Sequence, residues 1–77
     1  MTNTPDVGKM VHFHRKIASL SQLELAKLSG VGKTAVFDIE HGKKTVRLET
    51  LMKVLKSLNI SIWFQSPLMS LFEKEPK

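Results

Sequence analysis

The side chains of residues 33–38 could recognise a partner molecule by direct contact. They offer a cationic donor, a hydroxyl, an aromatic ring and a carboxylate, from Lys33, Thr34, Phe37 and Asp38. On a helix, Val36 and Ile39 would share the inward face, because positions three apart lie on the same side. The other four side chains would then point outward. So short a helix with so mixed an outer face is typical of an element that reads a surface.

A capped helix precedes this segment. Ser21 is a good N-cap and Glu24 follows three residues later, which is the pattern of a capping box. Gly30 stands where a left-handed residue would end that helix, and Gly42 does the same after the next one. Apolar residues at helical spacing form a stripe of Leu23, Leu25, Ala26 and Leu28. Residues 21–42 therefore predict two short helices joined by a glycine turn, a helix-turn-helix.

Two further helices are expected on either side of this unit. The first would end at about Ala18, with Thr4 as its N-cap, Pro5 at its first position and Asp6 in its first turn. Its apolar positions are Val7, Met10, Val11, Ile17 and Ala18. The other would span residues 48–58, with a buried stripe of Leu48, Leu51, Met52, Leu55 and Leu58.

From Asn59 the apolar pattern changes to strict alternation. Ile60, Ile62 and Phe64 alternate with more polar or bulkier residues, which is typical of a half-buried strand. Since the chain offers no second strand, we expect these three residues to pair with the same strand of a second copy across a two-fold axis. The predicted divisions are a flexible N-terminus (1–5), a helix-turn-helix domain (6–58), a dimerising strand (59–66) and an apolar, then charged tail (67–77).

The 77 residues carry a formal net charge of +5, and most of the excess lies in one half. Residues 1–47 hold eight Lys or Arg against four acidic residues, whereas residues 48–77 hold four against three. This bias favours a polyanion such as nucleic acid as the partner. There is no cysteine, no signal-peptide segment and no apolar run near the ~20 residues of a membrane helix. We therefore expect a cytoplasmic protein without membrane association.

No group of residues has the spacing of a catalytic or metal site. Gly32-Lys33-Thr34 ends like a phosphate-binding P-loop, but Lys27 stands where that pattern needs a glycine, and the segment before it is helical. His12 and His14 are two residues apart and would point in different directions on a helix. We expect no enzymatic activity, no cofactor and no metal.

Several residues within 21–42 match the sequence pattern of a known protein class, namely Gln22, Glu24–Ala26, Gly30–Val31, Val36 and Ile39–Gly42. Their order resembles the pattern T-Q-x-x-L-A, G-V, I-x-x-I-E-x-G of the Cro and phage-repressor (XRE) class of helix-turn-helix proteins. The resemblance covers residues 6–58. Gly32 departs from it, because members commonly carry Ser or Thr there, so the third helix would lack a side-chain N-cap.

The residues that follow narrow this resemblance. Lys43–Leu51, Leu55 and Leu58–Ile60, followed by a short apolar strand, resemble the HipB-type antitoxins of toxin–antitoxin systems. The resemblance implies a mostly α fold, in which a four-helix Cro/repressor-like domain carries a C-terminal β-strand that pairs across a homodimer.

The class resemblance also assigns roles to individual side chains, because its third helix reads base edges in the major groove of double-stranded DNA. Lys33 suits guanine O6 or N7, Phe37 a thymine methyl and Asp38 cytosine N4, with Thr34 beside them. Phosphate contacts fall to residues at both ends of that helix, namely Ser21, Gln22, Lys43, Lys44, Thr45 and Arg47. Ordinary surface roles fit Lys43 and Lys44 nearly as well. Arg15 and Glu40 occupy positions of a buried ion pair that ties the first helix to the third.

The apolar residues of the C-terminal segment are not needed to read DNA. They are a candidate partner-binding site or pack on the chain's own helices, and they comprise Trp63, Leu68, Met69, Leu71 and Phe72. The HipB resemblance implies a sequence-specific, dimeric repressor that binds a palindromic operator of its own operon. It also implies a HipA-like Ser/Thr kinase toxin as partner, in some systems split over two chains.

Two other interpretations stay open at this point. A phage-type repressor or a restriction-modification controller would share the DNA-binding half and have no toxin partner. A protein-interaction adaptor with a degenerate DNA surface would have no salt-dependent affinity for DNA.

Overall fold

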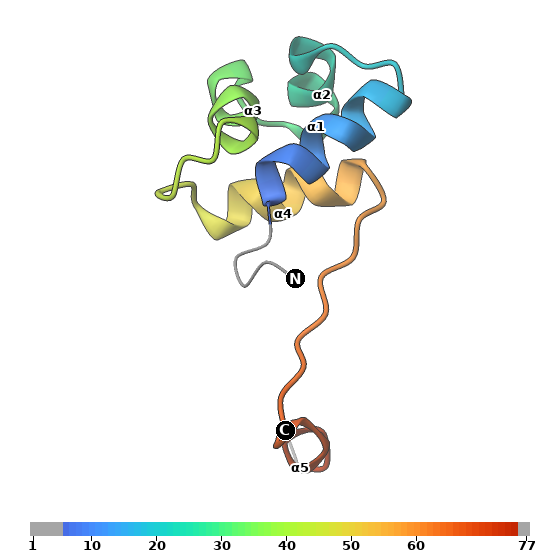
Figure 1. The fold of residues 1–77 in the computed structure, drawn as a ribbon, viewed down its shortest axis with the longest axis vertical. Helices are drawn as coiled ribbons and strands as arrows, with labels where there is room; N and C mark the ends of the chain where they lie inside the picture. Colours follow the sequence, from blue (N-terminus) through green and yellow to red (C-terminus); the bar gives the residue numbers. More distant parts are fainter. Residues whose placement is uncertain (1–5, 76–77) are drawn as a thin grey trace.

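Five helices make up the secondary structure of residues 6–75, the part of the chain that the computed structural model describes (Figure 1). They are α1 (Val7–Ile17), α2 (Gln22–Ser29), α3 (Lys33–Glu40), α4 (Leu48–Ser57) and α5 (Met69–Glu73). The prediction of a mostly α, four-helix domain containing a helix-turn-helix is therefore confirmed. The short helix α5 was not predicted.

The ends of α2 and α3 follow the predicted caps. Ser21 Oγ accepts from the Glu24 N–H at 3.0 Å, and the Glu24 carboxylate accepts from the Ser21 N–H at 2.8 Å, which completes the capping box. Gly30 ends α2 with a left-handed φ of 74°. Gly32 caps α3 without a side-chain hydrogen bond, as expected from its departure from the class pattern. Asp6 caps α1, whereas the N-cap and proline predicted at residues 4 and 5 lie outside the described residues.

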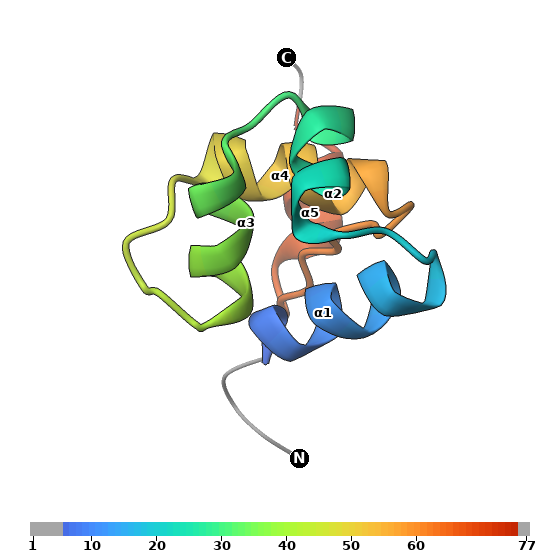
Figure 2. The ribbon, with the colours of Figure 1, turned by 90° about the horizontal axis from the view of Figure 1, so that it is seen from above.

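The core lies where α1 to α4 meet. α2 packs on α3 and α4, and α1 packs on α3 (Figure 2). The buried apolar side chains are Val11, Leu25, Ala26, Val36, Ile39, Val54 and Leu55. Val36 and Ile39 thus fill the inward face of α3, as their spacing predicted. Among residues 6–75 there is no helix long and apolar enough to cross a membrane.

Several residues predicted for the core are exposed instead. Ile17 is 72% exposed at the end of α1, and Leu48 and Met52 are 63% and 50% exposed on α4. Leu23 and Leu28 are likewise exposed on α2. Each side chain has helical spacing, but no other helix covers the edge of the stripe on which it lies. Val54, which was not predicted, is fully buried because it faces the other helices of the bundle.

The glycine at the second position of α1 permits a close approach of two helices. A Cβ atom on Gly8 would lie 2.5 Å from the carbonyl oxygen of Ile39 and 2.7 Å from that of Glu40. Both oxygens belong to backbone at the end of α3, so they cannot move away as a flexible side chain would. Gly8 therefore sets the distance between α1 and α3.

The strand predicted over residues 59–66 is wrong for the single chain, since no strand forms among residues 6–75. Asn59, with a left-handed φ of 59°, ends α4, and the Ile60 N–H donates to the Leu55 carbonyl at 2.9 Å. Residues 61–75, which we call the arm, then run away from the bundle to α5 (Figure 1). A strand needs another backbone beside it, and the described part of the chain has no second extended segment to supply one.

Candidate nucleic-acid interface

The outer face of α3 presents the four side chains predicted to read bases. Lys33, Thr34 and Phe37 are exposed and Asp38 is half-buried. They point away from the core because the buried Val36 and Ile39 occupy the opposite side of the helix. The described structure brings this set together within six consecutive residues of α3, so the four side chains can contact one ligand together.

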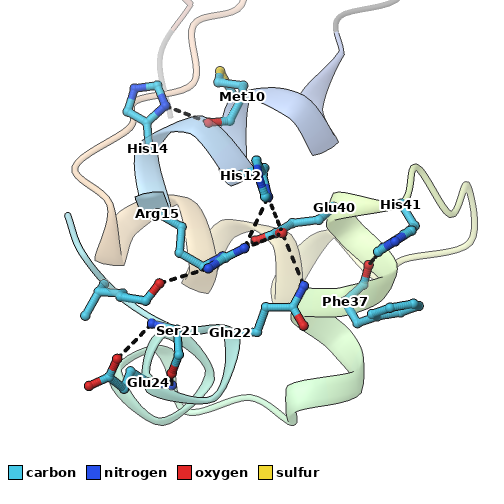
Figure 3. Close-up of polar contacts among 11 residues, drawn as sticks. Met10, His12, His14, Arg15, Ser21, Gln22, Glu24, Phe37, Glu40 and His41 are labelled. Carbon is cyan, nitrogen blue, oxygen red and sulfur yellow. Dashed lines mark hydrogen bonds and ion pairs between the residues drawn. The ribbon is translucent and has the colours of Figure 1, made fainter. Parts of the chain in front are cut away.

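The ring of Phe37 is held in place by a neighbour one turn along the chain. The rings of Phe37 and His41 stack with centroids 3.9 Å apart and planes 22° apart (Figure 3). His41 Nδ1 lies 2.8 Å from the Phe37 carbonyl oxygen, so Nδ1 carries the hydrogen and donates it. This arrangement leaves Phe37 46% exposed yet restricts its orientation. Phe37 and His41 therefore form one rigid aromatic surface at the end of α3.

Asp38 has a charged partner on the following loop. Lys43 Nζ lies 3.4 Å from Asp38 Oδ2, across the C-terminal end of α3. Both groups are partly exposed, so the pair contributes little to stability. The pair instead holds the Asp38 carboxylate and the Lys43 ammonium side by side. A ligand that binds one of these groups must therefore either break the pair or contact both groups.

A buried polar cluster fixes α3 relative to α1 and α2. Arg15 Nε donates to Glu40 Oε2 at 2.6 Å and Arg15 Nη2 donates to Glu40 Oε1 at 3.0 Å, so the contact is bidentate (Figure 3). Their side chains are only 9% and 3% exposed. Arg15 Nη1 also donates to the carbonyl oxygen of Leu20, which lies in the connection between α1 and α2. The pair that the class resemblance implied thus joins three segments of the domain.

Two further side chains converge on the same carboxylate. Gln22 Nε2 donates to Glu40 Oε1 at 3.2 Å, and His12 Nδ1 lies 2.9 Å from that oxygen. Burial by itself would raise the pKa of Glu40, but hydrogen bonds from Arg15, His12 and Gln22 outweigh it and hold the pKa at about 2. The hydrogen bond to Glu40 likewise raises the pKa of Arg15. Both groups therefore stay charged at neutral pH.

The start of α2 lies beside a hollow of about 710 Å³. Lys16 from α1 and Lys33 from α3 line it together with Ser21 and Gln22, two predicted phosphate contacts. The Ser21 hydroxyl is already occupied as a cap, and the Gln22 amide is held by Glu40. The ammonium groups of Lys16 and Lys33 are therefore the stronger anion-binding groups in this hollow.

The other predicted phosphate contacts lie on the loop between α3 and α4. This loop follows the C-terminal end of α3 (Figure 2), whereas Lys33, at the first position of α3, lines the hollow at the start of α2. Its polar side chains are all exposed, namely Lys43, Lys44, Thr45 and Arg47. Positive charge thus lies at both ends of the outer face of α3.

The residues predicted for dimer and partner contacts lie on the arm or just before it. Ile60 is half-buried against the core, whereas Ile62 and Phe64 are exposed. Trp63 is 87% exposed, so it does not pack on the chain's own helices. The apolar side chains in and before α5 are exposed or half-buried, namely Leu68, Met69, Leu71 and Phe72.

Sequence reasoning missed three residues that the structure brings to this surface. His41 lies one turn after Phe37, a spacing at which two helical side chains can stack, so the sequence did carry a signal for that contact. Lys16 reaches the hollow and His12 reaches Glu40 only because α1 crosses the ends of α2 and α3. The spacing of residues in the sequence does not predict such a crossing of helices. The described residues contain no cluster of His, Asp or Glu suited to a metal ion.

Comparison with known sequences gives one consistent result. The sequence model of the helix-turn-helix family matches residues 14–62. An uncharacterized HTH-type transcriptional regulator of Sinorhizobium fredii, y4mF, is 39% identical over 62 residues, which cover 80% of this chain and 82% of that protein. The control protein C.SmaI of Serratia marcescens is 38% identical over 56 residues, which cover 73% of this chain and 67% of that protein.

Comparison with solved structures gives the same fold. A chain in the structure described as the HipA-HipB-O2-O3 complex superimposes with a TM-score of 0.72 at 22% sequence identity. The alignment covers 87% of this chain and 97% of that one, so it extends beyond the four-helix bundle into the arm.

Proposed function

The chain belongs to the helix-turn-helix family of DNA-binding transcriptional regulators, and from this premise we propose that it is a sequence-specific repressor that binds a palindromic operator as a homodimer. One observation carries the proposal. The buried Arg15–Glu40 pair fixes α3 so that Lys33, Thr34 and Phe37 face outward together. A helix held in this way can read base edges without reorganising when it enters the major groove.

The charges around α3 support DNA as the ligand. Lys16 lies beside the hollow at one end of the outer face, and the Lys43–Arg47 loop lies at the other. In this proposal the side chains at both ends contact phosphates and the face between them contacts bases. Ser21 and Gln22 position the start of α2 near the phosphates, while Asp38 and Lys43 act as a pair.

The homodimer is proposed from the arm. Ile62 and Phe64 alternate with neighbours along an extended segment that makes no strand within residues 6–75. In a second copy related by a two-fold axis, the same segment supplies the missing backbone partner. Two reading helices held in one dimer would then fit two half-sites about 34 Å apart.

A protein partner is proposed for the arm. The side chains of Trp63, Leu71 and Phe72 expose large apolar areas that DNA binding does not need. Exposed aromatic side chains are common anchors at protein interfaces. The HipB-like features of residues 43–60 and the structural likeness to a chain of a HipA–HipB complex make a HipA-like kinase toxin, in one chain or two, the candidate partner. The protein would then be an antitoxin that represses its own operon.

A second candidate function rests on a different relative. The 38% identity to the control protein C.SmaI favours a controller of a restriction-modification operon. Such a protein would use the same DNA-binding surface. It would not need the apolar end of the arm as a site for a kinase.

Selection from randomised DNA tests the shared part of both proposals. Full-length protein should enrich a sequence with two inverted half-sites about one helical turn apart, and the same sequence should occur upstream of its own gene. Binding that is equally tight to all sequences would contradict the repressor assignment. Purification of the protein together with the product of the adjacent gene then separates the two functions. Capture of a kinase supports the antitoxin. If no kinase is captured and the adjacent gene encodes a restriction endonuclease, the result supports the controller.

A further inference from the structure

Phe37 and His41 make a flat apolar surface at the C-terminal end of the outer face of α3. Their rings stack with centroids 3.9 Å apart, and His41 Nδ1 donates to the Phe37 carbonyl oxygen at 2.8 Å (Figure 3). The Phe37 ring is nevertheless 46% exposed, and its neighbours on this face, Thr34 and Asp38, are polar. A ring that is exposed and yet held by a neighbour suits contact with a small apolar group of a ligand.

The major groove of DNA offers one prominent apolar group to such a ring. Among the four bases, only thymine carries a methyl group on its groove edge, at C5, beside groups that donate or accept hydrogen bonds. Cytosine methylated at C5 carries the same group at the same position. A side chain that contacts this methyl group therefore responds both to thymine and to the methylation of cytosine.

The residue after Phe37 favours cytosine as the base that meets the ring. The Asp38 carboxylate accepts hydrogen bonds and does not donate them, and Lys43 Nζ lies 3.4 Å from it. Next to the C5 methyl group, methylated cytosine presents the N4 amino donor, whereas thymine presents the O4 acceptor. A ring with a carboxylate beside it thus matches a methyl group with an amino group beside it, which is the edge of 5-methylcytosine.

From this juxtaposition we propose that the C-terminal end of α3 recognises 5-methylcytosine in double-stranded DNA. Phe37 contacts the C5 methyl group, Asp38 accepts from N4, and His41 is a positioning residue that holds the ring. A ring that is already oriented loses little conformational freedom on binding, which is why the stack matters. The inference rests on the proposed function and adds regulation to it, because methylation of one cytosine in each half-site would tighten operator binding.

Fluorescence anisotropy with modified operators tests the methyl contact. In the operator selected from randomised DNA, each cytosine is replaced in turn by 5-methylcytosine, and each thymine·adenine pair by cytosine·guanine with and without the C5 methyl group. At one position in each half-site, 5-methylcytosine should bind about fourfold more tightly than cytosine, the ratio for burial of one methyl-sized group. An operator in which no methylated cytosine binds more tightly would overturn the proposal.

Variants of the stacked pair show whether this ratio comes from their surface. Phe37→Ala should abolish the response to methylation, and a response that persists would overturn the methyl contact. His41→Ala should roughly halve the ratio, because the ring is then free to turn. His41→Phe keeps a ring beside Phe37 and should restore most of the ratio, so a failure to restore it would overturn the role of the stack.

A matched aromatic control lies on α1. Phe13 is 62% exposed and also lies beside a histidine ring, that of His14, with centroids 5.6 Å apart. Phe13→Ala should leave the ratio unchanged, and an equal loss in this variant would overturn the assignment to α3. Because each ratio compares two DNAs with one protein sample, an unfolded fraction of a variant lowers both affinities alike and cancels.

The identity of the base is tested through Asp38. At the same position, wild type should bind 5-methylcytosine more tightly than thymine. Asp38→Ala should keep the response to methylation and lose this preference, since the acceptor for N4 is gone. A preference that survives the substitution would overturn the role of Asp38.

These results are separable from the repressor proposal. An operator that is selected, and then bound equally in its methylated and unmethylated forms, would overturn this inference and leave the repressor standing. Equally tight binding to all sequences would overturn both.

Discussion

Arg15 Nε on α1 donates to Oε2 of Glu40, the last residue of α3, over 2.6 Å. Because Gln22 from the start of α2 and His12 from α1 reach the same carboxylate, this one group connects all three helices around the candidate DNA-binding surface. The contact is structural, since the buried Glu40 side chain cannot itself reach a ligand. It bears on DNA binding only through the position of α3.

Loss of the Glu40 charge should destabilise the fold. Glu40→Gln leaves the buried Arg15 without a counter-ion, so we expect a loss of about 3–5 kcal/mol in unfolding free energy at pH 7. Urea unfolding followed by circular dichroism measures this change. Glu75→Gln, at an exposed acid after α5, is the control and should unfold as wild type does.

The same pair should make stability depend on acid. The pKa of Glu40 is about 2 in the folded protein, below the ordinary value near 4.5. The group therefore contributes its full stabilisation above about pH 4.5 and loses it as the pH falls toward 2, by about 3 kcal/mol in all. Unfolding free energies measured from pH 7 to pH 2.5 should fall more steeply in wild type than in Glu40→Gln. Parallel profiles would show that the pair does not link folding to pH.

Gly8→Ala should disturb the approach of α1 to α3. The added Cβ would lie 2.5 Å from the Ile39 carbonyl oxygen, so α3 must shift, at a cost of about 1–3 kcal/mol. Gly32→Ser is an informative contrast, because open space surrounds that position and the hydroxyl can cap α3. It should raise the unfolding free energy by roughly a few tenths of a kcal/mol. Thermal unfolding of both variants checks the opposite signs.

Substitutions on α3 should separate sequence reading from general DNA affinity. A Lys33→Ala, Thr34→Ala variant should lose preference for the selected operator over random DNA. Lys43→Ala should weaken both kinds of binding alike and flatten the salt dependence. Lys74→Ala, on the arm, is the charge-matched control and should change neither. Fluorescence anisotropy over a salt series measures all three, and unchanged operator preference in the double variant would reject this reading face.

His41→Ala should reduce recognition at the base that faces Phe37. The stack and the hydrogen bond to the Phe37 carbonyl orient the ring, so their loss should lower operator affinity several-fold, equivalent to about 0.5–1.5 kcal/mol. Operators with uracil in place of single thymines identify the methyl group concerned. Wild type should discriminate there, while Phe37→Ala and His41→Ala should not. Phe13→Ala, at an exposed ring on α1, should behave as wild type.

Much of the fold follows from local signals in the sequence. The Ser21–Glu24 capping box and the left-handed Gly30 lie where the sequence placed them, because such caps involve residues only a few positions apart. The inward spacing of Val36 and Ile39 likewise leaves the outer face of α3 as predicted. These features depend on helix geometry and local hydrogen bonds, which need no knowledge of distant segments.

Burial depended on packing between helices. Leu48 and Met52 have the spacing of core residues, yet both are exposed, whereas Val54 is buried. A helical period defines stripes of side chains, but the neighbouring helices select which stripe is covered. The cluster around Glu40 has the same origin, because Glu40 lies on α3 while its donors come from α1 and α2, and only the crossing of these helices brings them together.

In the C-terminal segment the sequence pattern did not predict the structure of the single chain. Alternation over Ile60, Ile62 and Phe64 predicted a strand, but no strand forms among residues 6–75, because the single chain supplies no second backbone beside this segment. The described single chain leaves that segment as an arm and folds the residues after it into α5. Extended conformation is a property of the residues themselves, whereas a β-strand exists only through hydrogen bonds to another segment.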